Sequence, residues 1–141
     1  MQNRNKHKIK VSVTVNAPVE KVWKIWTAPY AITEWYNASP DWHTPRAEND
    51  LRAGGTFNFR MEAKDGSYGF DFSGIYTKVV QNEHIASTLD DNRKVVTEFS
   101  AVIGGTIVTQ LFEADDENTP ELQQAGWQAI LDNFSVYVKD H

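Results

Sequence analysis

Polar and apolar residues alternate strictly over 8–15, where the chain reads Lys-Ile-Lys-Val-Ser-Val-Thr-Val. This pattern predicts a strand with one buried face. Asn16, as a capping side chain, and Pro18, as an early-turn proline, predict that a helix begins directly afterwards. Apolar residues at helical spacing over 19–26 give this helix one apolar stripe. Pro29 ends it and opens a second short helix.

The middle of the chain first loses and then regains its periodicity. Residues 37–51 contain two prolines and no clear pattern, so a loop is predicted there, a candidate mobile rim. Two strands with aromatic residues in phase follow, joined by the strong hairpin turn signal of Lys64-Asp65-Gly66-Ser67. Further strands are predicted at about 83–89, 93–101 and 105–113. Successive strands without intervening helices favour an antiparallel meander.

A long helix is predicted at the C-terminal end. Thr119 is its expected cap and Pro120 lies in its first turn, and the pattern continues to about Lys139. Its expected apolar face consists of Leu122, Gly126 or Trp127, Ile130, Leu131, Phe134 and Val138. The order of elements is a strand, two short helices, a meander and a last helix. It predicts one α+β domain over 1–141, with its core at about 8–139.

The composition is rich in aromatic residues and argues against several classes of partner. The 141 residues include five Trp, seven Phe and five Tyr, enough ring surface to fill a core or line a pocket. The net charge of -5 argues against nucleic-acid binding, which requires clustered positive charge. The one basic cluster, at Arg4, Lys6, Lys8 and Lys10, is interpreted mainly as the solvated face of the first strand, with a weak anion-binding arm as the alternative.

The absence of cysteine excludes disulfides, thiolate metal sites and a cysteine nucleophile. No apolar run approaches the roughly 18 residues of a membrane span. Residues 1–6 lack the apolar stretch of a signal peptide. We therefore expect a cytoplasmic protein without a membrane span.

Several short motifs, taken in their order and spacing, resemble one known family over about residues 8–139. They are Ala17-Pro18-Val19-Glu20-Lys21-Val22-Trp23, Glu34-Trp35-Tyr36, Leu51-Arg52-Ala53-Gly54-Gly55-Thr56-Phe57, Asp65-Gly66, Gly74, Gly105-Thr106 and Gly126-Trp127. Together they resemble bacterial members of the Hsp90-ATPase-activator-homologue (AHSA1-like) family, within the START/Bet v 1-like (SRPBCC) superfamily. The resemblance implies a helix-grip fold, in which a curved antiparallel sheet of six to seven strands wraps around the C-terminal helix and leaves a cavity.

The expected ligand site lies between the aromatic strands and the last helix. A strongly bent sheet against one helix is hard to fill, and ligand sites are concave and mostly apolar. The alternative is that these side chains interlock as an ordinary core. Tyr36 and Trp42, with Trp35, are expected near the entrance. The predicted ligand-binding residues are Trp35, Phe57, Phe59, Met61, Phe70, Phe72, Trp127, Leu131 and Phe134.

The sequence assigns no catalytic residue, metal site or cofactor. His7, His43, His84 and His141 lack metal-ligand spacing, and no Gly-x-Ser-x-Gly hydrolase motif is present. Glu98 and His43 are the only titratable residues that we name as candidates to face the cavity. The alternation around Glu98 does not decide whether its side chain points into the cavity or away from it.

Three functions are compatible with these features. The leading hypothesis is a module that binds a small apolar or amphipathic molecule of unknown identity. The first alternative is a cyclase- or hydratase-type enzyme acting on a hydrophobic substrate, which leaves enzymatic activity open. The second is an Hsp90 co-chaperone or stress-response interaction domain, which the family's name suggests. Fold alone does not choose among them.

Overall fold

The computed structural model describes residues 7–141, so Arg4 and Lys6 of the basic cluster lie outside the described residues. The described elements, in chain order, are β1 (Lys8–Val15), α1 (Val19–Thr27), α2 (Pro29–Trp35), β2 (Trp42–Asn49), β3 (Thr56–Ala63), β4 (Gly69–Val80), β5 (His84–Leu89), β6 (Lys94–Val102), β7 (Gly105–Glu113) and α3 (Pro120–Asp140). The predicted α+β order is confirmed.

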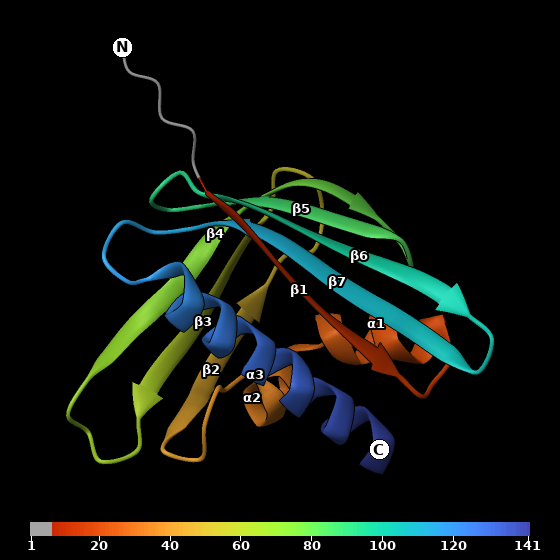
Figure 1. Ribbon diagram of the computed structural model, residues 1–141, viewed down its shortest axis with the longest axis horizontal. Coiled ribbons are helices and arrows are strands. Elements are labelled where there is room, and N and C mark those ends of the chain that lie inside the picture. Colours follow the sequence, from red (N-terminus) through yellow and green to blue (C-terminus); the bar gives the residue numbers. More distant parts are fainter. Residues whose placement is uncertain (1–6) are drawn as a thin grey trace.

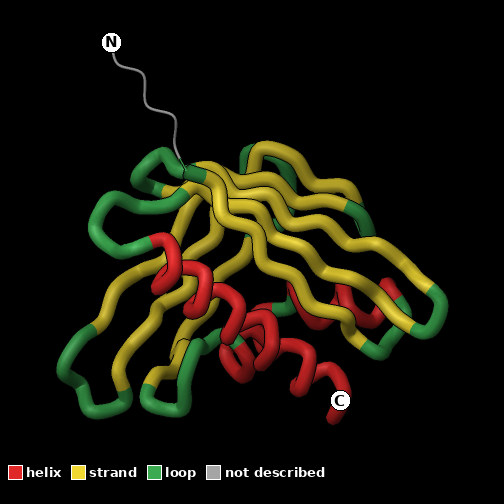
Figure 2. The backbone as a smooth tube through the Cα atoms, in the orientation of Figure 1, coloured by secondary structure: helices red, strands yellow, loops and turns green. Residues whose placement is uncertain are grey.

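The seven strands form one antiparallel sheet in the order β1-β7-β6-β5-β4-β3-β2. The first strand therefore pairs with the last, from Lys8 opposite Glu113 to Val15 opposite Thr106. Neighbouring strands twist relative to one another, and the sheet curls into a half-barrel. Figure 1 shows α3 lying across the concave side of this sheet. Figure 2 shows the β2–β4 end folding away from the β1 and β5–β7 end, with the helices between them. The helix-grip fold is confirmed.

The core forms where α3 meets the sheet and the two short helices. Leu131, Phe134 and Val138 of α3 are fully buried, as is Trp35 of α2. The Thr119 side chain caps α3 by accepting from the backbone N–H of Leu122, as predicted. Leu122, which was predicted on the apolar face of this helix, is instead 62% exposed, and Gln123 is buried. Within residues 7–141, no helix combines the length and apolar character needed to cross a membrane.

Two further sequence predictions are wrong. Residues 42–49 were predicted as a loop but form β2, an edge strand that holds Pro45 and shifts register between His43 and Arg46. Proline and irregular pairing are tolerated at a sheet edge, and there the alternation that marks a strand is lost. Helix α1 begins after Pro18 without any side-chain cap, so Asn16 does not cap it.

Gly74 lets two neighbouring strands approach each other closely. A Cβ atom at this position would lie 2.5 Å from the Thr88 carbonyl oxygen and 3.1 Å from Cε1 of Phe57. Only glycine fits between these atoms without moving the backbone. The close approach keeps Phe72 and Tyr76, on either side of Gly74, against the ring of Phe57.

Candidate functional site

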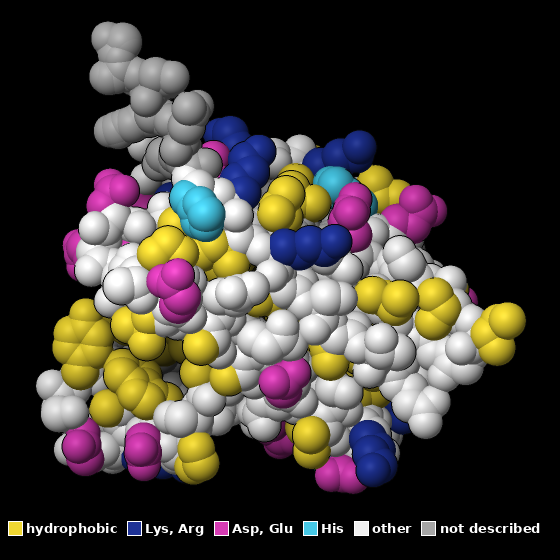
Figure 3. Space-filling model, in the orientation of Figure 1, with side chains coloured by type: hydrophobic (Ala, Val, Ile, Leu, Met, Phe, Trp, Pro, Cys, Tyr) yellow, Lys and Arg dark blue, Asp and Glu magenta, His cyan; other side chains and the backbone are white. Residues whose placement is uncertain are grey.

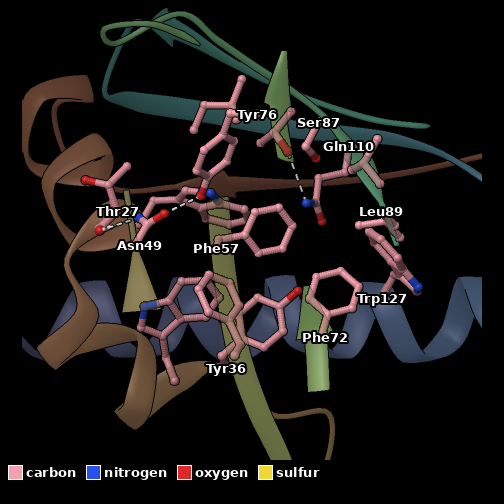
Figure 4. Close-up of a pocket in the computed structure, with 16 residues that line it drawn as sticks. Thr27, Tyr36, Asn49, Phe57, Phe72, Tyr76, Ser87, Leu89, Gln110 and Trp127 are labelled. Carbon is pink, nitrogen blue, oxygen red and sulfur yellow. Dashed lines mark hydrogen bonds between the residues drawn. The ribbon is translucent and has the colours of Figure 1, made fainter. Parts of the chain in front are cut away.

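An internal cavity lies between the concave face of the sheet, the junction of α1 with α2, and α3 (Figure 4). Its volume is about 50 Å³. This holds a few water molecules, whereas occupied ligand pockets typically measure about 300–1,000 Å³. The lining residues are Trp26, Thr27, Trp35, Tyr36, Asn49, Phe57, Phe59, Phe72, Tyr76, Ile85, Ser87, Leu89, Val95, Thr97, Gln110 and Trp127. The site is therefore a nearly filled aromatic chamber.

Aromatic rings make up half of the sixteen lining residues. On the sheet side, Phe57 lies 5.3 Å from Phe59 and 5.1 Å from Tyr76, measured between ring centroids. On the helix side, Trp127 stacks on Phe112 with centroids 3.8 Å apart and meets Phe72 edge-on at 6.0 Å. Trp127 and Phe72 are only partly buried. Trp26 is likewise only partly buried, so the ring lining is incompletely covered both at Trp26 and at the wall that Phe72 and Trp127 form.

The structure brings together five of the nine predicted ligand-binding residues. Trp35, Phe57, Phe59, Phe72 and Trp127 line the cavity.

The other four lie outside its lining. Met61, Leu131 and Phe134 are buried in the surrounding core. Phe70 is 38% exposed and packs against Trp42 and Tyr68 instead. Phe70 shares the strand phase of Phe72 but lies at the free end of the β3–β4 hairpin. Periodicity alone does not show whether other elements of the protein cover this part of the strand.

The apolar surface continues outside the cavity. Figure 3 shows hydrophobic side chains gathered around a hollow between the start of α3 and the β3–β4 end of the sheet. Tyr68 at the hairpin is 63% exposed, and Leu122 on the first turn of α3 is 62% exposed. Trp42, predicted near an entrance, lies in this outer region and not in the cavity lining.

Two polar side chains of the lining, Tyr76 and Asn49, are hydrogen-bonded to each other. The Tyr76 hydroxyl donates to Oδ1 of Asn49, and Nδ2 of Asn49 donates to the Thr27 carbonyl oxygen at 2.8 Å. Burial raises the pKa of the Tyr76 hydroxyl well above its ordinary value, while the Asn49 hydrogen bond acts in the opposite direction. These two hydrogen bonds connect α1, β2 and β4, and the Tyr76 hydroxyl proton is already donated to Asn49.

Other polar side chains of the lining can still form further hydrogen bonds. Nε2 of Gln110 donates to the Thr97 hydroxyl at 3.1 Å. Within residues 7–141, the hydroxyls of Tyr36 and Ser87 form no hydrogen bond with another side chain or with the backbone. Burial, with a smaller effect of nearby Tyr76, raises the pKa of the Tyr36 hydroxyl well above its ordinary value. The phenol therefore stays protonated and can donate.

Sequence reasoning missed these polar residues, although a signal was present. Gln110 alternates in phase with the buried Val108 and Phe112, and Thr97 does so with Val95 and Phe99. A polar residue in phase with a buried strand face marks a side chain that points into the interior.

Neither titratable candidate named from the sequence faces the cavity. Glu98 points outward from β6, and its Oε2 lies 3.3 Å from Nδ1 of His84. His43 lies on β2 with Nε2 3.8 Å from a Glu62 oxygen, beside a broad open hollow of about 820 Å³. The lining contains no Asp, Glu, Lys, Arg or His. General acid–base chemistry by a carboxylate or imidazole has no candidate residue in it.

Comparisons with known proteins place these features in a family context. A family model described as Activator of Hsp90 ATPase homolog 1-like protein matches residues 16–139. No curated protein matches the chain. The solution structure of an AHSA1-like protein from Aeromonas hydrophila is 44% identical, covers 95% of this chain and 93% of its own, and has a TM-score of 0.89.

Two further solved structures are similar to this chain over most of its length. A protein from Cytophaga hutchinsonii is 47% identical, with 97% of this chain and 94% of its own covered and a TM-score of 0.80. A protein from Chromobacterium violaceum is 22% identical, covers 92% of this chain and 96% of its own, and superposes with a TM-score of 0.83, which supports the fold alone.

Proposed function

This chain belongs to the Activator of Hsp90 ATPase homolog 1-like protein family, and from that premise and the cavity geometry we propose that it binds a small apolar molecule between the sheet and α3. The observation that carries the proposal is the interior lining, half aromatic and without a charged side chain. Apolar concave sites with a few convergent polar groups are the usual form of small-molecule sites.

The small volume of the cavity sets a condition on binding. A ligand larger than a few waters requires the rings to separate, because about 50 Å³ is free in the structure. We place this separation at the Phe72–Trp127 wall, because both rings are partly exposed and meet edge-on with centroids 6.0 Å apart. The proposal therefore includes an opening movement at this wall.

Titration with small arenes tests the proposal. Naphthalene, indole and toluene are added to isotope-labelled protein, and amide and indole N–H chemical shifts are followed. We expect saturable shifts at Trp127, Leu89 and Ile85, and none at the β6–β7 turn around Gly104, which lies away from the cavity lining. Native mass spectrometry of freshly purified protein would reveal a ligand retained from the host. Absence of both saturable shifts and retained ligand would refute binding in the cavity.

The two alternatives draw less support from the site. An enzyme of cyclase or hydratase type lacks a carboxylate or imidazole in the lining. A co-chaperone role rests on the name of the family. A pull-down and ATPase assay with the host Hsp90 would test that role independently of the cavity.

A further inference from the structure

We infer that the ligand of this cavity is an uncharged molecule with a hydrogen-bond acceptor, which the Tyr36 hydroxyl binds. This inference rests on the proposed function and narrows it from apolar molecules in general to neutral carbonyl, ether or hydroxyl compounds built on a compact ring. Two observations support it: the state of the Tyr36 hydroxyl and the absence of charge in the lining.

The Tyr36 side chain is only 8% exposed, and its hydroxyl points into the cavity (Figure 4). The ring is held between Trp35 at 5.2 Å, Phe59 at 5.1 Å and Phe72 at 6.0 Å. It is therefore placed rigidly, while its hydroxyl finds no partner among residues 7–141. The hydroxyl borders the cavity and is not sealed off from it, so its hydrogen-bond partner is water or a ligand inside the cavity.

The contrast with Tyr76 shows that the free hydroxyl is specific to one residue. Both phenols lie in the same cavity, but the Tyr76 proton is already donated to Asn49. One hydrogen of the Gln110 amide is donated to Thr97. Of the two hydroxyls without a partner, Ser87 is short and stays close to β5, whereas the Tyr36 ring carries its hydroxyl from the opposite side into the cavity. Tyr36 is therefore the better placed donor.

The lining also excludes a charged ligand. None of the sixteen lining residues carries a charge, so no cation faces a carboxylate or phosphate and no anion faces an amine. A buried ion without a partner loses its hydration without compensation, and one phenol hydrogen bond does not offset that loss. A neutral acceptor loses far less on entry and regains a hydrogen bond from Tyr36.

Three probes of closely similar size separate these requirements: acetophenone, which is neutral and has an acceptor; ethylbenzene, which is neutral and lacks one; and benzoate, which is charged at neutral pH. Affinities are measured by chemical-shift titration. In the unsubstituted protein we expect acetophenone to bind about five- to tenfold more tightly than ethylbenzene. Benzoate should bind more weakly than either.

Two variants assign the hydrogen bond. Tyr36→Phe keeps the ring and removes the hydroxyl, so acetophenone should lose its advantage over ethylbenzene in this variant. Ser87→Ala removes the other unpartnered hydroxyl and should keep the preference. Retained amide spectra establish that both variants are folded.

Each other result overturns the inference in a recognisable way. Equal binding of acetophenone and ethylbenzene, binding of benzoate as tight as acetophenone, or a preference for acetophenone that persists in Tyr36→Phe would reject the role of Tyr36 while leaving apolar binding intact. If none of the three probes binds the unsubstituted protein, the proposed function itself fails and the inference fails with it.

Discussion

The carboxamide of Gln128 on α3 hydrogen-bonds both backbone groups of Ser12 on β1. Its Nε2 donates to the Ser12 carbonyl oxygen at 2.8 Å, and its Oε1 accepts from the Ser12 N–H at 3.4 Å. β1 is an edge strand, and its free backbone groups would otherwise be open to pairing with another chain. The glutamine thus takes the place of a neighbouring strand and attaches the helix to this edge of the sheet.

Replacing Gln128 tests this attachment. Gln128→Met keeps the length and helix propensity of the side chain but removes its hydrogen bonds. We expect a loss of about 1 kcal/mol in the free energy of unfolding by urea, and faster hydrogen exchange at the Ser12 amide. Gln124→Met is the matched control, because Gln124 makes a single 3.3 Å bond to the Lys10 carbonyl. An equal or larger loss in the control would contradict the special role of Gln128.

Two aromatic residues on α3 should differ in their contribution to stability. Phe134 is fully buried, with its ring 4.6 Å from Trp35 and 5.0 Å from Trp26. Phe134→Ala should cost about 3–5 kcal/mol. Trp127 is only partly buried and has the cavity on one side, so Trp127→Ala should cost clearly less. Denaturant unfolding compares the two, and an equal loss would mean that Trp127 is fully packed in solution.

The helices and most of the strands could be predicted because each has one buried face with a regular period. β1, β7 and α3 show this well. β2 could not be predicted, because as an edge strand with Pro45 it buries only Thr44 fully and its polar residues do not alternate with apolar ones. The curl of the sheet around α3 came from the family resemblance, since periodicity states which face is buried but not what covers it.

The residues of the cavity lining could also be predicted only in part, because periodicity does not state what covers a strand. The phase of Phe57, Phe59 and Phe72 placed them correctly in the cavity lining. The identical phase of Phe70 was misleading, because the covering of the sheet ends before that residue. Tyr36 was expected at an entrance, yet its hydroxyl lies inside, a result of the turn between α2 and β2 that no local pattern encodes.

Stability should fall at alkaline pH through the two cavity tyrosines. Burial raises the pKa of Tyr36 and of Tyr76 above the ordinary tyrosine value of about 10. The folded state therefore keeps protons that the unfolded chain loses, and the stability from these phenols is complete below about pH 10 and declines as the pH rises above it.

Unfolding by urea at increasing pH measures this decline. It should be shallower in Tyr36→Phe and shallowest in Tyr36→Phe/Tyr76→Phe. Tyrosinate absorbance that shows both phenols ionising while the circular dichroism is still native would contradict the rise in their pKa through burial.

Phe72 and Phe70 provide the sharpest test of where the ligand enters. They lie two residues apart on β4 and share its phase, but Phe72 borders the cavity and Phe70 does not. Phe72→Ala removes a ring from the wall opposite Trp127, so a ligand no longer has to separate the rings to enter. Removing that conformational cost should tighten naphthalene binding about tenfold. Phe70→Ala should leave the affinity unchanged, because its ring packs on Trp42 and Tyr68 outside the cavity. The opposite ranking, with Phe70→Ala altering the affinity and Phe72→Ala leaving it unchanged, would place the binding site in the outer hollow instead of between the sheet and α3.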